Sequence, residues 1–353
     1  MPTDAKAPTA KAEAWALFDH IVEEAKRDDT HTSPWIAEGE GKVRYVPDYR
    51  VLEQLLGVPL HLRAGTQSGV PALALDVWLS YELRRAGFDE DQVWPRPKHP
   101  RILPSSVAKL IKTLPKELRE GVTKRVNSAG AIPGVTMASA SILGKNYFKQ
   151  VDVIMTGWDT GPELLISTKR MDSSYGKNAP NRIEESYGDA KNLRLRHPLA
   201  ALGFAFALRS DILHKEPRAA NWLFDLLAKL GQEDDAYHAT CVILMKYDDA
   251  VAPPDTRPEE PSGMPALNDE ADLDAVPAAS MANDTAEAIV AGLPKVTVLT
   301  DQTPPNLCPG RFLEAMVRRV LAATPVNVHE AARERLREAG QPAAAHEMPP
   351  EAP

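Results

Sequence analysis

The chain is poor in cysteine. Only Cys241 and Cys308 occur among its 353 residues. Two cysteines this far apart argue against both a zinc site and a disulfide scaffold, and they fit a reducing, cytoplasmic environment. We therefore expect both to be buried as small apolar side chains.

Long apolar runs and nucleotide-binding motifs are also missing. No stretch of about 18 apolar residues occurs, and the first residues lack the apolar core of a signal peptide, so neither a membrane partner nor secretion is expected. The chain has no Gly-x-x-x-x-Gly-Lys loop and no methyltransferase or helicase motif. ATP-driven translocation is therefore not expected of it.

Charge is unevenly placed along the sequence. The net charge is −8, yet residues 101–218 hold 19 Lys and Arg against 11 Asp and Glu, whereas residues 233–287 hold 2 against 14. Contacts to phosphate depend on charge within roughly one Debye length, about 8 Å, so a distant acidic segment need not prevent them. A basic middle region could also be an ordinary solvated surface.

Two short apolar runs separated by a turn predict a β-hairpin in the basic region. The runs cover residues 151–155 and 164–166, with glycine and proline between them. Because alternate residues of a strand share a face, a turn around residues 158–159 places Asp152 opposite a residue between Leu165 and Ser167. Asp152 and Lys169 can then border one pocket.

This arrangement resembles the PD-(D/E)xK nuclease family, in which an acid on one strand and a (D/E)-x-K triplet on the next bind Mg²⁺ and position water against a phosphate. The triplet here is Ser167-Thr168-Lys169, and serine is a poor ligand for a hard cation. A subgroup of restriction enzymes in this family has serine there and supplies the carboxylate from the following helix. Glu184 and Glu185 stand at about that distance, in a helix expected to start straight after Pro180.

The resemblance implies a role for each of these residues. Asp152, one of the two glutamates and the backbone carbonyl of Thr168 would bind Mg²⁺, with Glu184 preferred over Glu185. Lys169 would hold the attacking water, and Ser167 would offer a hydrogen bond. Glu82, on an early helix, is a secondary candidate for the same site; its alternative is a simple ion pair with Arg84 or Arg85.

The implied partner is double-stranded DNA, and the implied activity is that of a restriction or phage-defence endonuclease, which is compatible with a homodimer that cuts both strands. The polar segment 169–182 is rich in Gly, Ser and Asn and is expected to be a loop along the phosphates. The candidate DNA-binding residues are Lys145, Lys149, Arg170, Lys177, Arg182, Lys191, Arg194 and Arg196.

Other interpretations of the same residues stay open. The Ser-Thr-Lys triplet could mark decay in a non-catalytic DNA-binding protein that keeps the nuclease fold. Asp152 and Lys169 could instead form a cross-strand ion pair in an unrelated α/β protein. Glu184 and Glu185 would then be a solvated helix face.

Strands alternating with helices predict an α/β fold, with a central mixed sheet of restriction-endonuclease-like type flanked by helices and a helical N-terminal region. A helical insertion is expected at residues 98–143, built on one helix over 105–125, and it could contact DNA or simply be a surface helix. The expected organisation is a disordered segment at 1–12, a helical region at 13–66, an α/β core at 67–249 and 286–330, a disordered acidic insertion at 250–285, and a loose tail at 340–353.

Overall fold

The computed structural model describes residues 8–27, 33–39, 41–127, 132, 135–136, 140–252 and 278–341. Three expectations lie mostly outside the described residues: disorder at 1–12, disorder at 250–285 and the loose tail at 340–353. Where residues of the first two are described, the expectation fails in part, because residues 10–12 and 283–285 are helical. No helix among the described residues is long and apolar enough to cross a membrane.

The described residues form helices and strands in alternation along much of the chain. The α-helices are α1 Ala10–Arg27, α2 Tyr49–His61, α3 Val70–Arg85, α4 Ser105–Thr113, α5 Lys116–Val126, α6 Tyr175–Arg194, α7 Ile212–Lys215, α8 Pro217–Leu230, α9 Asn283–Ala291, α10 Pro309–Ala323 and α11 Glu330–Gly340. The strands are β1 Trp35–Gly39, β2 Lys42–Tyr45, β3 Val93–Trp94, β4 Ser141–Leu143, β5 Phe148–Gln150, β6 Val153–Gly157, β7 Gly161–Met171, β8 Ala201–Arg209, β9 Ala239–Lys246 and β10 Thr297–Val298.

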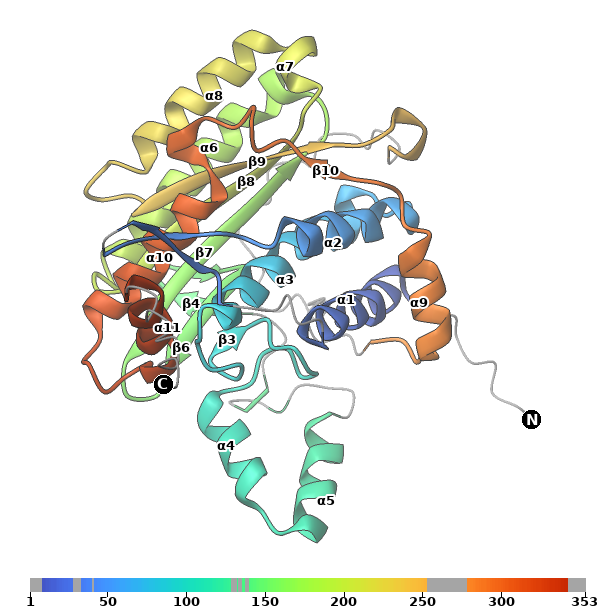
Figure 1. Cartoon of the computed structure of the whole chain (residues 1–353), viewed down its shortest axis with the longest axis vertical. Helices are drawn as coiled ribbons and strands as arrows, with labels where there is room; N and C mark the ends of the chain where they lie inside the picture. The colour runs from blue at the N-terminus through green and yellow to red at the C-terminus, as the bar shows by residue number, and fades with distance from the viewer. Residues whose placement is uncertain are drawn as a thin grey trace, which may run out of the picture.

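A six-stranded mixed sheet in the order β10-β9-β8-β7-β6-β3 forms the centre of the molecule (Figure 1). β6 and β7 make an antiparallel hairpin, and β7, β8 and β9 run parallel. Parallel neighbours need crossovers, which α6 provides between β7 and β8, and α7 with α8 between β8 and β9. The expected mixed sheet flanked by helices is confirmed.

Each face of the sheet is covered by helices, because the central strands are apolar on both sides. All nine residues of β8 are buried. On β7, Leu164 and Ile166 belong to the core that includes α1, α2, α3 and α10, whereas Leu165 belongs to the core under α6 and α8. Successive side chains of β7 therefore point into opposite layers of the protein.

The N-terminal region is not wholly helical as expected. β1 and β2 pair as an antiparallel hairpin within it, in which Trp35 stands opposite Tyr45 and the two buried rings pack edge to face at 5.1 Å. Two further helices, α9 and α11, were not anticipated, since short alanine-rich segments carry a weak apolar periodicity.

The single helix expected over 105–125 is two helices. Leu114 and Pro115 separate α4 from α5, and Leu114 takes an extended conformation because the residue before a proline avoids the helical one. The two helices project from the body of the protein (Figure 1). They leave Leu110 58% and Leu118 59% exposed.

The segment expected to be a long phosphate-binding loop is mostly regular structure. β7 runs to Met171 and α6 begins at Tyr175, so three residues connect them. Pro180 lies inside α6 instead of before it. A proline there removes one internal hydrogen bond, and burial of Ala179 and Ile183 beside it offsets that loss.

Glu82 belongs to a buried structural network in the N-terminal half. Its carboxylate accepts hydrogen bonds from the Tyr45 hydroxyl at 2.9 Å and the Asp48 backbone N–H at 2.7 Å, and it pairs with Arg85 at 2.8 Å. Its side chain is 0% exposed and does not line the cleft described below. The secondary assignment of Glu82 to the functional site is therefore wrong, and its pairing with Arg85 is confirmed.

Glu82→Ala should destabilise the protein by about 3–5 kcal/mol, because it leaves the Arg85 guanidinium buried without its carboxylate. Urea unfolding followed by circular dichroism would measure the change. Glu24→Ala is the matched control, since Glu24 makes an exposed ion pair on α1 and should cost less than about 1 kcal/mol. Equal losses of unfolding free energy in the two variants would show that the buried network around Glu82 contributes no more than an exposed ion pair.

His238 connects α6 to the sheet. Its Nδ1 accepts the Leu202 backbone N–H at 2.9 Å, and the Arg194 guanidinium lies against its ring. Burial, helped by the charges of Arg194 and Arg319, lowers the pKa of His238 to about 4. The neutral ring is therefore the form that the fold stabilises.

Acid should weaken the protein through His238. The folded pKa lies below the ordinary 6.5, so this stability is present above about pH 6.5 and is lost as pH falls towards 4. After allowance for partial solvent screening we expect about 1–2 kcal/mol between pH 7 and pH 4.5. Urea unfolding at both pH values would test this: His238→Asn should lose less stability across the window than the wild type, and an unchanged loss would contradict the assignment.

Candidate functional site

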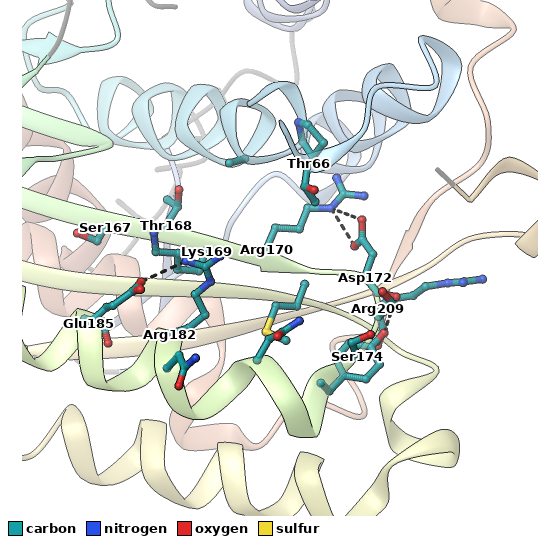
Figure 2. A pocket seen from close by; sticks show the side chains of 18 of the residues that line it. Thr66, Ser167, Thr168, Lys169, Arg170, Asp172, Ser174, Arg182, Glu185 and Arg209 are labelled. Atoms are coloured by element: carbon teal, nitrogen blue, oxygen red, sulfur yellow. Dashed lines mark hydrogen bonds and ion pairs between the residues drawn. The ribbon is translucent and has the colours of Figure 1, made fainter. Parts of the chain in front are cut away.

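The hairpin of β6 and β7 brings four of the expected site residues into one cleft, Thr168 among them. Val153 pairs with Ile166, so Asp152 stands just before β6, beside Ser167 of β7. Asp152, Ser167 and Lys169 all line a cleft of about 760 Å³ at the carboxyl end of β7. α6 forms one wall of this cleft, and residues from the start of α3 reach its rim (Figure 2).

A chain of hydrogen bonds fixes the centre of the cleft. The Asp152 carboxylate accepts the Thr168 backbone N–H at 2.7 Å, which holds the acid against β7. The Thr168 hydroxyl donates to the Asp76 carboxylate of α3 at 2.7 Å. Thr168 therefore links Asp152 to an acid on the opposite face of the sheet.

The wall from α6 presents Glu185 and not Glu184. Ile183 and Ser186 are buried, so the helix turns Glu185 along the cleft, where its carboxylate pairs with Arg182 at 3.2 Å. Glu184 is exposed and does not line the cleft. The expected preference for Glu184 is thus reversed. Figure 2 shows Lys169, Arg182 and Glu185 lying together between the strand and the helix.

Lys169 is the cation at the centre of this group. It lies on β7 one residue beyond Thr168 and lines the cleft. Within the described residues its ammonium group has no hydrogen bond or ion pair. Lys169 can therefore bind a ligand without first breaking an ion pair. Arg182 differs, because it is already paired with Glu185.

The floor of the cleft is a buried tyrosine. The Tyr237 hydroxyl donates to the Ser186 backbone carbonyl at 2.8 Å. Burial, with the charges of Asp189 and Asp152 adding to it, raises the pKa of Tyr237 far above its ordinary value. The Tyr237 hydroxyl therefore stays neutral, under the influence of the Asp152 and Asp189 carboxylates.

Asp189 connects α6, which forms one wall of the cleft, to β5. Its carboxylate pairs with Lys149 at 2.6 Å and accepts the Tyr147 hydroxyl at 3.1 Å. Burial and the Asp189 charge raise the pKa of Tyr147 to about 12, so its hydroxyl remains a donor at neutral pH. Lys149 and Asp189 both line the cleft.

The far end of the cleft is polar but largely occupied by its own ion pairs. Arg170 pairs with Asp172 at 3.0 Å, and its side chain is only 2% exposed. Burial alone would lower the pKa of Arg170, but the Asp172 carboxylate outweighs it and raises that pKa above its ordinary value. Arg170 is thus a buried, paired residue and not the exposed DNA contact that was expected.

The other expected DNA-binding residues are dispersed. Lys149 and Arg182 line the cleft. Lys191 pairs with Asp235 at 2.9 Å and Arg194 lies against His238, so both are engaged away from the cleft. Three further candidates are exposed but do not line it: Lys145, Lys177 and Arg196.

The donor set fits a cation that keeps much of its water. Among the described residues no group of three or more His, Cys, Asp or Glu side chains is placed to hold a metal ion. Mg²⁺ needs no such cage, because it is usually bound by one or two carboxylates together with waters and substrate phosphate. Asp152 and Glu185 both line the cleft and are the carboxylates that such a cation would use.

Comparison with known proteins adds no relative. No protein-family model, no curated protein and no solved structure matches this chain.

Three residues of the site were missed by sequence reasoning. Asp189 could have been found, because it lies four residues after Glu185 and therefore on the same helix face. Asp76 contacts Thr168 from the opposite face of the sheet, and Tyr237 lines the cleft; both are placed only by tertiary packing, of α3 and of the loop before β9. No local pattern marks either residue.

Thr168→Val should cost about 1–3 kcal/mol, because it leaves the buried Asp76 carboxylate without the hydroxyl that donates to it. Thr168→Ser keeps the hydroxyl and is the matched control, with a smaller loss expected. Both would be measured by urea unfolding. Equal stability of the valine and serine variants would show that the Thr168 to Asp76 hydrogen bond contributes nothing.

Proposed function

We propose that this protein is a Mg²⁺-dependent endodeoxyribonuclease of the restriction or phage-defence type, which hydrolyses phosphodiester bonds in DNA. One observation carries the proposal: Asp152, Lys169 and Glu185, from three consecutive elements, line the same cleft. An acid, a lysine and a second acid are the groups that metal-assisted hydrolysis of a phosphodiester requires.

The order of elements supports the proposal. The acid stands before β6, the lysine lies near the end of β7, and the second carboxylate is on α6, which crosses over to the parallel strand β8. That order agrees with the PD-(D/E)xK variant that has serine in its strand triplet and its carboxylate on the following helix. We therefore extend the proposal to a restriction-endonuclease-like core.

Each residue has a distinct role in this proposal. Asp152 and Glu185 would hold the Mg²⁺, with the Thr168 backbone carbonyl as a further oxygen ligand. When bound, Mg²⁺ lowers the pKa of the attacking water and offsets the negative charge on the phosphate oxygens. Lys169 orients that water and stabilises negative charge as it develops. Ser167 offers a hydrogen bond beside the carboxylates.

The cleft also offers contacts for the rest of a phosphate backbone. Lys149 and Arg182 line its two sides, and both are already held by acids of α6. An incoming phosphate can share such a pair, because a guanidinium or ammonium group has several donors. DNA binding would therefore weaken with salt, as expected of backbone contacts.

A second candidate is a non-catalytic DNA-binding protein that retains this fold. The observation in its favour is that Ser167 occupies the acid position of the triplet, and no three-carboxylate group stands nearby among the described residues. Such a protein would bind DNA through the same cleft but would not depend on Asp152 for any chemical step.

Cleavage of plasmid and linear duplex DNA with and without Mg²⁺ would test the proposal. We expect Asp152→Asn, Lys169→Ala and Glu185→Gln each to reduce the rate at least about a hundredfold, because each removes a metal ligand or a charge-stabilising donor. EDTA should abolish cleavage by the wild type. Gel electrophoresis of timed samples measures the rates.

Glu184→Gln is the matched control. It changes the neighbouring residue on α6, which is exposed and outside the cleft, so its cleavage rate should stay within about twofold of the wild type. A wild type that binds DNA yet never cuts it would favour the non-catalytic candidate. Full cleavage activity of the Lys169→Ala protein would contradict the proposed mechanism.

A further inference from the structure

A small hairpin beside the cleft is held rigidly by α6. β4 and β5 pair antiparallel around a turn at residues 144–147. The Asn192 side chain of α6 accepts the Asn146 backbone N–H at 2.8 Å and donates to the Tyr147 carbonyl at 3.0 Å. A Cβ at Gly144 would meet that side chain at 2.1 Å, so a larger residue there would displace the Asn192 amide. The hairpin is therefore a fixed projection and not a loose loop.

The hairpin has two faces with different roles. Tyr147 and Lys149 point to α6, where both contact Asp189. Alternation along the strand turns Phe148 and Gln150 the other way. Gln150 lines the cleft, while Phe148 is 54% exposed.

The Phe148 ring is thus an exposed apolar surface on the same strand as Lys149 and Gln150, which line the polar cleft. It lies four residues before Asp152, at most about 14 Å along an extended chain. Lys145 is exposed in the turn of the same hairpin. An exposed aromatic ring beside cations is the combination that proteins use to stack a nucleic-acid base while contacting its backbone.

We propose that the β4–β5 hairpin holds a single-stranded portion of the substrate, with Phe148 stacked on an unpaired base and Lys145 against the neighbouring phosphate. This inference rests on the proposed nuclease function and specifies its substrate. A base inside a duplex keeps its faces stacked on its neighbours, so a protein ring can stack only on a base that is unpaired or splayed out. The preferred substrate is therefore DNA with an unpaired stretch next to the cleavage position.

Binding measurements on the full-length protein test the proposal without interference from cleavage. Fluorescence anisotropy with Ca²⁺ in place of Mg²⁺, so that a divalent cation with oxygen ligands is present, would compare a labelled single-stranded oligonucleotide with a blunt duplex of the same sequence. The wild type should bind the single strand more tightly. Phe148→Ala should weaken single-strand binding by about fivefold to a hundredfold, the range for loss of one stacked base, and should change duplex binding less than twofold.

Two further variants complete the design. Phe148→Trp keeps a flat ring and should restore single-strand binding to near the wild-type value. Trp158→Ala removes an equally conspicuous aromatic side chain, 89% exposed at the turn between β6 and β7, at the end of β7 away from the cleft. It should leave both affinities unchanged, since its ring lies far from the proposed strand path.

The outcomes separate this inference from the proposed function. If the Phe148→Ala protein binds and cuts like the wild type, the hairpin proposal is overturned and the nuclease proposal stands. A loss that is as large for the duplex as for the single strand also overturns it, because stacking on an unpaired base predicts a difference. If the wild type binds neither oligonucleotide, both proposals fail together.

Discussion

The antiparallel register of β6 and β7 sets the positions of Asp152, Ser167 and Lys169 in the cleft. Val153 faces Ile166, and this pairing brings the Asp152 carboxylate to the Thr168 backbone N–H at 2.7 Å. A shift of one residue would turn Lys169 towards the other face of the sheet, away from α6. Burial of Leu164 and Ile166 in one core and of Leu165 in the other opposes such a shift, so packing stabilises the site geometry.

The direction of Glu185 depends on a second constraint, the seating of α6 on the sheet. The sequence offers two neighbouring helix stripes, and local periodicity does not choose between Glu184 and Glu185. The choice is made by tertiary contacts: Ser186 is buried where its carbonyl accepts the Tyr237 hydroxyl, and Ile183 packs in the same core. Tyr237 lies 51 residues further along the chain. Its contribution was therefore out of reach of local reasoning.

The parts of the fold that sequence reasoning found share one property, a strong local pattern. The hairpin of β6 and β7 was expected where it occurs, because two apolar runs flank a turn that contains glycine and proline. The mixed sheet flanked by helices was expected from a pattern of the same kind, the alternation of strands and helices along the chain. The parts that were missed are short or break a local rule: β4 and β5 have three residues each, and α6 continues through Pro180 because its buried residues compensate.

The charge balance of the cleft explains why a metal ion is a natural component of the proposed site. Six acids and six bases line it, and most are already paired, as in Lys149 with Asp189, Arg170 with Asp172 and Arg182 with Glu185. A phosphodiester entering a cleft of balanced charge meets carboxylates as well as cations, and close approach to a carboxylate is repulsive. A divalent cation between Asp152, Glu185 and the phosphate would reverse that repulsion, whereas Lys169 alone supplies one positive charge. The same acids that oppose bare DNA would thus favour its complex with Mg²⁺.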